Sequence, residues 1–320
     1  MKKSFLTASA VLSASALVLT GCSGGDDEYP TESAEMLVGY GAGGANDTVA
    51  RSFAAALEEP FGQSVLVVNR PGGGGTIAAT EAAAAEADGY NLFMAPVAAF
   101  TSATLMQDVS YSNEDFRSIA PIAQQGYVVV TRESSEWNSL ADLENAQGTV
   151  THSSFGEGHA SHLVAGEVLH KLGVDGQAVP FDSSGEAVQS VINGDTALGV
   201  IDLATALPRI ESGELKALAV TGDEPPEQLA DVPTVTDAGF PEADYLVTQA
   251  LVVPAETPDE VVEVLSQDTE EAVQSDSYQE FLDTSYNTVP EASGEDWMAE
   301  FVPAERARYQ EAYERLGIEG

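Results

Sequence analysis

One pattern of hydrophobic and polar positions recurs along the chain: a short apolar run, a turn rich in glycine or serine, and a segment with apolar residues at helical spacing. The first such turn precedes a segment whose apolar positions recur at i, i+4, i+7 and i+8, which predicts a helix that starts near Asn46 or Asp47. Its buried positions are Val49, Phe53, Ala56 and Leu57. Strands are predicted at residues 65–68, 91–95, 127–131, 149–152, 179–181, 196–201, 215–221 and 246–253. Helices are predicted at residues 76–85, 159–172, 186–192, 260–274 and 297–316.

This alternation of strands and helices predicts an α/β protein, and about 290 residues beyond the N-terminal segment favour two domains. Parallel strands whose carboxyl ends carry small-residue turns place those turns on one rim of a sheet, where open α/β sheets bind ligands. Two such rims that face one another form a cleft. The pattern therefore predicts a ligand site between two α/β lobes.

The turn within residues 38–51, VGYGAGGANDTVAR, has the composition of an anion site. Gly41, Gly43 and Gly44 permit positive φ angles and let a ligand approach the backbone. The helix that follows offers unpaired N–H groups and the positive end of its dipole to a carboxylate or phosphate. The nucleotide-binding motifs do not fit, because no lysine follows the glycines and the last glycine of the dinucleotide fingerprint is missing. A tight strand-to-helix connection without a ligand is the alternative.

The N-terminus has the features of a lipoprotein signal: a lysine pair, an apolar run at 5–19, and the sequence LTGC that ends at Cys22. The apolar run is short for a transmembrane span. Cys22 is the only cysteine, which favours a lipid anchor over a disulfide, a metal site or a catalytic thiol. We therefore expect a signal peptide with a lipobox at 1–22, an acidic tether at 23–28, and a protein anchored to the outer face of the cell membrane.

Asp and Glu number 52 against 12 Lys and Arg, which gives a formal net charge of −40 at pH 7. We expect no binding to nucleic acid, because the chain has no cationic stripe that could release counterions. With 43% hydrophobic residues the chain is not a disordered acidic tail. The acidity is instead typical of a salty habitat, where a Debye length of about 3 Å at 1 M salt screens the self-repulsion. We therefore expect the fold to loosen at low ionic strength.

Several short motifs follow one another behind the lipobox. They are VGYGAGGAND at 38–47, NRPG at 69–72, DGY at 88–90, SHL at 161–163, ALP at 206–208, LAVT at 218–221, DVPTV at 231–235, and Pro254 followed by TP at 257–258. In this order they resemble the signatures of the substrate-binding receptors of tripartite tricarboxylate transporters, the Bug family of extracytoplasmic solute-binding proteins. The resemblance spans roughly residue 29 to the C-terminus.

The resemblance implies a type II periplasmic-binding-protein fold, in which two α/β lobes are joined by two crossover strands with a cleft between them. Lobe 1 would comprise about 29–130 and 246–320, and lobe 2 about 131–245. A ligand carboxylate would lie between the first glycine turn and the turn at 153–159, with no cofactor and no metal. The candidate ligand-binding residues are Tyr40, Ala42, Gly43, Gly44, Asn46, Asp47, Ala98, Ser153, Ser154, Gly156, Gly158, His159, Phe181 and Asp202.

Some of these side chains have an alternative structural role. Tyr40 either contacts the ligand or closes the first strand as a half-buried aromatic residue. Asp47 either contacts the ligand through water or orders the turn as a helix cap. Asp202 either accepts a hydrogen bond from a ligand hydroxyl or amine or caps the next helix. Outside the candidate set, Arg70 either reaches the cleft or holds the glycine turn through a salt bridge.

The second turn offers neutral hydrogen-bond donors. Ser153, Ser154 and His159 could hold a carboxylate, and a carboxylate held by neutral donors avoids the cost of an unpaired buried charge. Serine and glycine are also common in turns without a ligand. The spacing of His159 and His162 suits a metal pair, but no third ligand is evident.

The chain departs from the family pattern at several positions. Gly39 stands where proline is common, and Asn46 replaces the usual threonine. The run Phe181-Asp182-Ser183 stands in place of Tyr-Lys-Gly, which removes a hydroxyl and a cation. Glu157 adds a negative charge near the mouth of the cleft. These departures favour a ligand less anionic than citrate.

Together these features predict a lipid-anchored receptor that closes its lobes around a small organic carboxylate and delivers it to the subunits of a membrane permease. We expect a monomer without enzymatic activity. A ligand-binding accessory of a membrane sensor kinase is an alternative function. A secreted hydrolase is a weaker alternative: GCSGG at 21–25 matches the G-x-S-x-G motif, but it follows no predicted strand, opens no helix and lies at the cleavage site.

Overall fold

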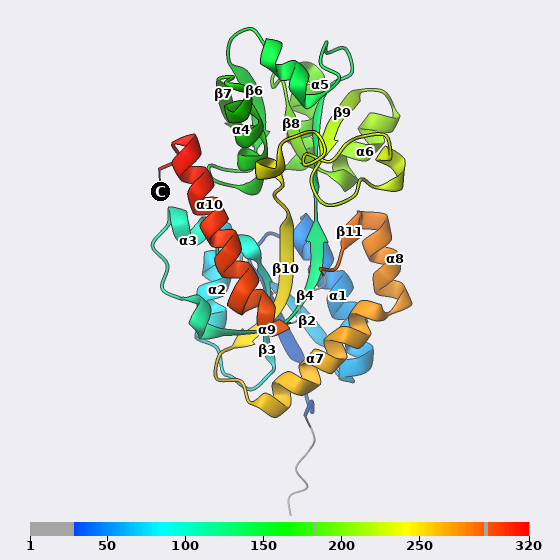
Figure 1. The fold of residues 1–320 in the computed structure, drawn as a ribbon. Helices are drawn as coiled ribbons and strands as arrows, with labels where there is room; N and C mark the ends of the chain where they lie inside the picture. Colours follow the sequence, from blue (N-terminus) through cyan, green and yellow to red (C-terminus); the bar gives the residue numbers. More distant parts are fainter. Residues whose placement is uncertain (1–28, 182, 291–293, 320) are drawn as a thin grey trace, which may run out of the picture.

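The computed structural model describes residues 29–181, 183–290 and 294–319. The predictions for the signal peptide, Cys22, the acidic tether and Asp182 lie outside the described residues. Two α/β lobes lie one above the other and are joined by strands that run between them (Figure 1). This is the two-lobe α/β fold that the sequence predicts.

The first lobe, lower in Figure 1, is built on a six-stranded sheet in the order β11-β4-β10-β3-β1-β2. In it β1, β2 and β3 run parallel, and β10 is antiparallel to both β3 and β4. The strands are β1 (Ala34–Val38), β2 (Val65–Asn69), β3 (Asn91–Pro96), β4 (Phe116–Gln125), β10 (Val247–Pro254) and β11 (Asn287–Thr288). Distant parts of the chain therefore share one sheet.

Helices cover both faces of this sheet. They are α1 (Ala45–Phe61), α2 (Thr76–Ala83), α3 (Ser102–Met106), α7 (Asp259–Gln274) and α8 (Asp276–Ser285). Phe53 of α1 and Leu265 of α7 belong to the core on one face, and Phe93 and Phe100 belong to the core on the other. The helical spacing predicted for α1 is confirmed, because all four of its predicted apolar positions are buried.

The second lobe has a three-stranded antiparallel sheet, β8-β5-β9, and a parallel pair, β6-β7. The parallel bridge between His152 and Leu198 links the pair to the chain that leads into β8. The strands are β5 (Tyr127–Arg132), β6 (Val150–Ser154), β7 (Gly176–Pro180), β8 (Gly199–Asp202) and β9 (Leu215–Val220). The helices are α4 (Ala160–Leu172), α5 (Ser184–Asn193) and α6 (Leu203–Glu211). No helix among the described residues of either lobe is long and apolar enough to cross a membrane.

The last helix, α10 (Val302–Leu316), lies alongside both lobes (Figure 1). It follows α9 (Gly294–Asp296) and a π-helical turn (Trp297–Phe301). Val302 belongs to the core of lobe 1, whereas Tyr309 belongs to the core of lobe 2. The helix thus contributes to both cores, and the lobe boundaries drawn from the sequence stay a prediction.

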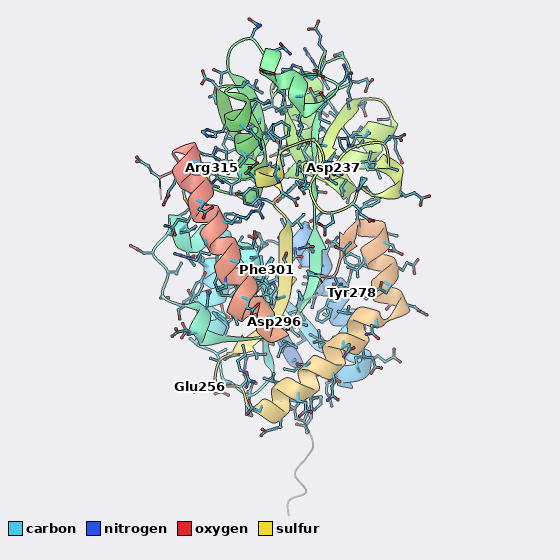
Figure 2. All side chains as sticks on the ribbon, in the orientation of Figure 1. Asp237, Glu256, Tyr278, Asp296, Phe301 and Arg315 are labelled. Atoms are coloured by element: carbon cyan, nitrogen blue, oxygen red, sulfur yellow. The ribbon has the colours of Figure 1, made fainter. Side chains whose placement is uncertain are left out.

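The C-terminal half of α10 is held to lobe 2 by polar contacts. Arg315 forms an ion pair with the buried Glu167 of α4 at 2.7 Å. The Tyr313 hydroxyl donates to the Gly158 carbonyl at 2.7 Å. Figure 2 shows Arg315 toward one end of the continuous helical segment and Asp296 toward the other, with Phe301 between them. One end of the segment is therefore fixed beside the turn at 153–159.

Strand β4 is the main element that the sequence pattern does not predict. Its pairing with β10 shifts register twice, so that Ile119 and Ile122 are left without a partner residue. Pro121 lies between these bulges, where the missing N–H costs little. The bulges and the proline interrupt the alternation by which a strand is normally predicted. Elsewhere, the strand expected at 149–152 continues to Ser154, and the π-helical turn divides the helix expected at 297–316.

Candidate ligand-binding site

The first candidate turn connects β1 to α1 at the carboxyl end of the parallel strands. Gly43 has φ +83°, which favours glycine. Gly44 is the N-cap of α1 with φ −82°, and no side chain caps the helix there. Ala42, Gly43 and Gly44 are exposed, and Asn46 is half-buried. The first N–H groups of a 17-residue helix therefore face the rim without a capping side chain, as an anion site requires.

Asp47 orders this turn from the first turn of the helix. Its Oδ2 accepts from the Gly43 N–H at 2.8 Å and from Arg51 Nε at 2.9 Å, and its Oδ1 accepts from Asn69 Nδ2 at 2.9 Å. Burial alone would raise the pKa of Asp47, but the hydrogen bonds from Arg51, Gly43 and Asn69 outweigh it and lower the pKa. Asp47 is therefore ionised, and it acts from the third helical position instead of the N-cap.

A second glycine turn, residues 72–75, supports the first from behind. A Cβ on Gly39 would lie 2.6 Å from the Gly75 Cα, so the two turns are in direct backbone contact. The Tyr40 hydroxyl donates to the Gly74 carbonyl at 3.2 Å. Arg70 pairs with Glu81 of α2 at 3.0 Å. A side chain at position 39 would therefore collide with the backbone of Gly75.

The second candidate turn connects β6 to α4. The Ser153 side chain is fully buried, and its Oγ accepts from the Val200 N–H at 3.0 Å. The Ser154 Oγ donates to the Gly156 carbonyl at 2.6 Å and accepts from its N–H at 3.1 Å. Gly156 has φ +132° and Gly158 has φ +70°. Both serine hydroxyls are therefore engaged in holding the turn in shape.

His159 and His162 are held as neutral acceptors at this turn. His159 caps α4, because its Nδ1 accepts from the Ser161 N–H at 3.2 Å. The Nδ1 of His162 accepts from the Gly158 N–H at 3.2 Å. Burial, and then the neighbouring His162, lowers the pKa of His159 to about 4. No group of three or more His, Cys, Asp or Glu side chains that could hold a metal occurs in the described part of the chain.

The remaining predicted residues follow other strands at the same rim. Ala98 is half-buried in the short helix after β3. Phe181 follows β7, and its N–H donates to the Ser154 carbonyl at 2.9 Å. Asp202 ends β8 and caps α6, because its Oδ1 accepts from the Thr205 N–H at 2.9 Å. These residues lie at or shortly after the carboxyl ends of strands, where the sequence predicts a shared rim.

Sequence reasoning missed Tyr127 in the first crossover strand. In the sheet Tyr127 pairs with Asp202, and its ring centroid lies 6.5 Å from that of His159. Burial raises the pKa of Tyr127, and the neighbouring carboxylate of Asp202 raises it further. The Tyr127 hydroxyl therefore keeps its proton and can act as a hydrogen-bond donor.

Gln249 of β10, the returning strand, was missed as well. Its Nε2 donates to Asn46 Oδ1 at 3.1 Å, and its buried Oε1 has no hydrogen-bond partner. Because the oxygen of Asn46 is occupied, the Asn46 amide N–H groups remain to donate to a ligand. Gln249 is the one amide in an apolar strand, and that isolation was the signal that could have identified it.

The geometry suits binding and not nucleophilic catalysis. Ser161 Oγ lies 3.0 Å from His159 Nδ1, but Ser161 is fully buried and its Oγ already accepts from the Phe155 N–H at 3.0 Å. Among the described residues no carboxylate contacts His159 to orient it as a base. The uncapped N-terminus of α1 can therefore hold an anion, whereas the turn before α4 does not activate a serine.

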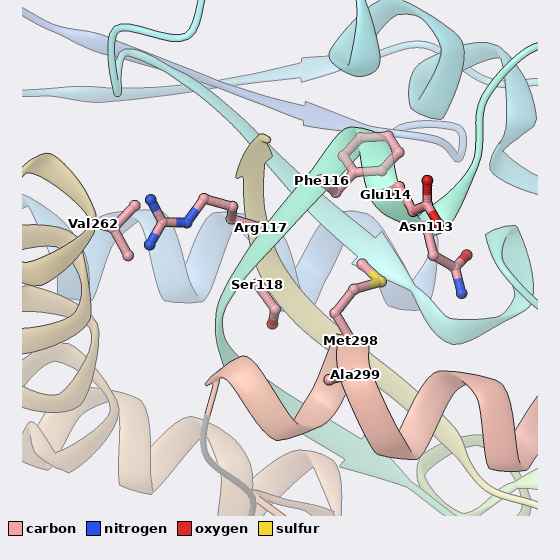
Figure 3. A pocket seen from close by; sticks show the side chains of 8 residues that line it. All are labelled: Asn113, Glu114, Phe116, Arg117, Ser118, Val262, Met298 and Ala299. Atoms are coloured by element: carbon pink, nitrogen blue, oxygen red, sulfur yellow. The ribbon is translucent and has the colours of Figure 1, made fainter. Parts of the chain in front are cut away.

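A cavity of about 310 Å³ lies elsewhere, between β4, α7 and the π-helical turn (Figure 3). Its lining includes Phe116 and Ser118, at the end of β4 that pairs with Val252 and Pro254. The carboxyl end of β3 pairs instead with Gln249. The cavity is thus at the opposite end of the sheet from the candidate turns.

Comparisons with known proteins agree with this geometry. The family described as "Tripartite tricarboxylate transporter family receptor" matches residues 49–318. Protein BugT of Bordetella pertussis is 30% identical over 258 residues, which cover 78% of each chain. Rpa4515 of R. palustris, solved with adipate, superimposes with a TM-score of 0.79 at 28% identity, over 91% of this chain and 99% of that one. MatC of Rhodopseudomonas palustris, solved with bound malate, has a TM-score of 0.74 at 26% identity, over 89% and 99%.

The match of the family over most of the chain, the identity to BugT and the shared two-lobe fold all lead to one assignment. Members of this family are solute-binding receptors and not enzymes. The chain therefore belongs to the tripartite tricarboxylate transporter receptors of the Bug type.

Proposed function

We propose that this receptor binds the carboxylate of a small organic acid between the β1–α1 turn and the β6–α4 turn. The observation that carries the proposal is the uncapped N-terminus of α1, whose turn is ordered by the ionised Asp47. The adipate and malate bound by the two related structures support a carboxylate as the ligand. The proposed ligand-binding residues are the fourteen candidates named above, with the serines of the second turn acting through its shape.

The proposed mechanism is lobe closure. Each lobe supplies part of the donors: the first helical N–H groups and Asn46 from lobe 1, and His159 with the remaining N–H groups of the 153–159 turn from lobe 2. The carboxylate receives hydrogen bonds from both sets of donors only when the lobes are closed, so it binds the closed state more tightly than the open state. This difference in affinity shifts the population toward the closed state. Because α10 is packed into both cores, we infer that the lobes move about that helix and the crossover strands.

We further propose that the receptor is a monomer anchored by a lipid on Cys22 at the outer face of the membrane, and that it delivers its ligand to the subunits of a permease. The sequence around Cys22 supports the anchor, and the transporter family supports the permease. Replacement of Cys22 by alanine would release the protein from the membrane fraction. A variant that remains in that fraction would contradict the anchor.

The binding site is tested by a thermal-shift screen of carboxylic acids in molar salt, since a ligand that binds only the native state raises its melting temperature. The Gly44→Val variant places a branched side chain at the uncapped helix end, and the φ of −82° accommodates it without strain. We expect this variant to fold and to lose at least tenfold in affinity. The control variant is Ala84→Val, which adds the same side chain at the exposed residue that follows the C-terminal end of α2, and it should bind normally. Equal affinity of Gly44→Val and wild type would contradict the site.

A further inference from the structure

Among the described residues, Arg51 is the cation that contacts a candidate turn, and it is paired there with Asp47. Seven of the ten lysines and arginines in the described ranges form ion pairs with carboxylates, at the pairs Arg51–Asp47, Arg70–Glu81, Arg117–Asp259, Lys171–Glu242, Arg209–Glu214, Arg308–Glu305 and Arg315–Glu167. Lys216 donates to three oxygens near Trp137, and Arg306 donates to Thr104. Arg132 is at the end of β5 opposite to Tyr127. Positive potential at the rim therefore comes from helix N-termini and neutral donors.

The aromatic and imidazole groups at the rim are also uncharged near neutral pH. Burial raises the pKa of Tyr40 to about 12, so its hydroxyl keeps its proton. Tyr127 behaves in the same way. His159, whose pKa is lowered, stays neutral. Tyr127 and His159 can donate hydrogen bonds to one carboxylate, but none of these groups supplies a formal charge to balance a second.

Two side-chain oxygens at the same rim accept no hydrogen bond from the described residues. Asp202 is half-buried where β8 ends beside Tyr127; its Oδ1 caps α6, and no described group donates to its Oδ2. Gln249 is 1% exposed, and its Oε1 has no hydrogen-bond partner. Its Nε2 donates to Asn46, which places the side chain beside the N-terminus of α1. An unpaired buried acceptor destabilises a site until a water or a ligand donates to it. The rim thus has an excess of acceptors and a shortage of cations.

We propose that the ligand is a monocarboxylate that also carries a hydrogen-bond donor, a hydroxyl or an ammonium group, which Asp202 accepts. This proposal rests on the proposed carboxylate site. A second ligand carboxylate would lie near the Asp202 charge without a cation to offset the repulsion, and repulsion between like charges is strong in a partly buried site. The receptor would therefore differ in ligand preference from the two relatives solved with dicarboxylates.

The test compares ligands of equal length that differ only in the terminal group. Adipate, 6-hydroxyhexanoate and 6-aminohexanoate form one set, and succinate, 4-hydroxybutanoate and 4-aminobutanoate form another. Isothermal titration of the full chain at pH 7 in molar salt measures each Kd. In the set whose length fits, we expect the hydroxy acid or the amino acid to have a Kd at least about tenfold lower than that of the dicarboxylate. Comparison of the hydroxy acid with the amino acid then shows which donor is preferred.

The Asp202→Asn variant keeps the helix cap, because asparagine caps as well as aspartate. We expect it to bind the dicarboxylate about tenfold more tightly and the amino acid about tenfold more weakly than wild type does. Asp175→Asn removes one charge from an exposed position before β7, at the far end of the same lobe, and should leave the ratio unchanged.

The outcomes separate this inference from the receptor function. If wild type binds the dicarboxylates more tightly than the hydroxy acids and amino acids of the same length, the proposed preference for a monocarboxylate with a donor is overturned, and the proposed carboxylate site is left intact. An unchanged ratio in Asp202→Asn would overturn the role of Asp202. If neither these ligands nor any acid of the thermal-shift screen binds, both the inference and the proposed function are overturned.

Discussion

The substitution Asp47→Asn tests how the first turn is held. Asp47 is 3% exposed and accepts three hydrogen bonds through two oxygens, whereas an asparagine amide has one acceptor oxygen. The amide nitrogen would then face either the Gly43 N–H or the amide of Asn69, both of which are donors. A hydrogen bond to a charged group contributes about 1.5–3 kcal/mol. The bond from Arg51 adds little, because that side chain is 52% exposed. We therefore expect the variant to lose about 2 kcal/mol of unfolding free energy at pH 7.

Denaturant unfolding of wild type and variant in molar salt measures this difference, with the exposed Asp175→Asn as a control for charge removal. The pKa of Asp47 is lowered by folding, so its stabilisation is complete above the ordinary value of about 3.9 and is lost as the pH falls through the lowered value. The difference between wild type and variant should thus shrink below about pH 4. Equal stabilities at pH 7, or a difference that persists under acid, would refute this account of the turn.

Three further predictions concern the fold. Gly39→Ala should cost about 1–3 kcal/mol of unfolding free energy, because its Cβ would meet Gly75, whereas Gly41→Ala has open space and should be neutral; equal effects would contradict the contact between the turns. Burial lowers the pKa values of His152 and His159 from 6.5 to about 4, so the unfolded state binds more protons and stability should fall as the pH drops from 6.5 toward 4, by about 1.4 kcal/mol per pH unit for each group. His159→Gln should flatten this slope, and an unchanged slope would count against the buried neutral imidazole. The melting temperature should rise between dilute buffer and 2 M NaCl, because salt screens the acidic chain; a flat curve would exclude the expected salt dependence.

The elements beside the turns could be predicted from the sequence because local rules determine them. Helical spacing at Val49 and Phe53 marks the buried face of α1, and the glycine turn before it marks where the helix begins. His159 and Asp202 were expected where strands end, and both act as helix caps. The capping role of Asp202 and the ordering role of Asp47 were among the alternatives that the sequence left open.

Other features depend on contacts between distant residues. Tyr127 lies in a strand where polarity alone gives no sign of the rim, and Gln249 is marked only by its isolation in an apolar strand. Sheet pairing brings the two residues beside His159 and Asn46. The two bulges of β4 are set by its pairing with β10. The C-terminal half of α10 packs on lobe 2, because Tyr309 is buried in the core of that lobe. The spacing of apolar residues within the helix does not indicate which lobe it contacts.

The central claim is that the two turns hold one carboxylate together. Amide hydrogen exchange with and without the tightest ligand of the screen tests it directly, at peptides that cover 39–48 and 153–162. The account predicts slower exchange in both segments, because those N–H groups of the two turns that have no partner within the protein donate to the ligand in the closed state. Protection of only one segment, or of neither, would contradict the claim.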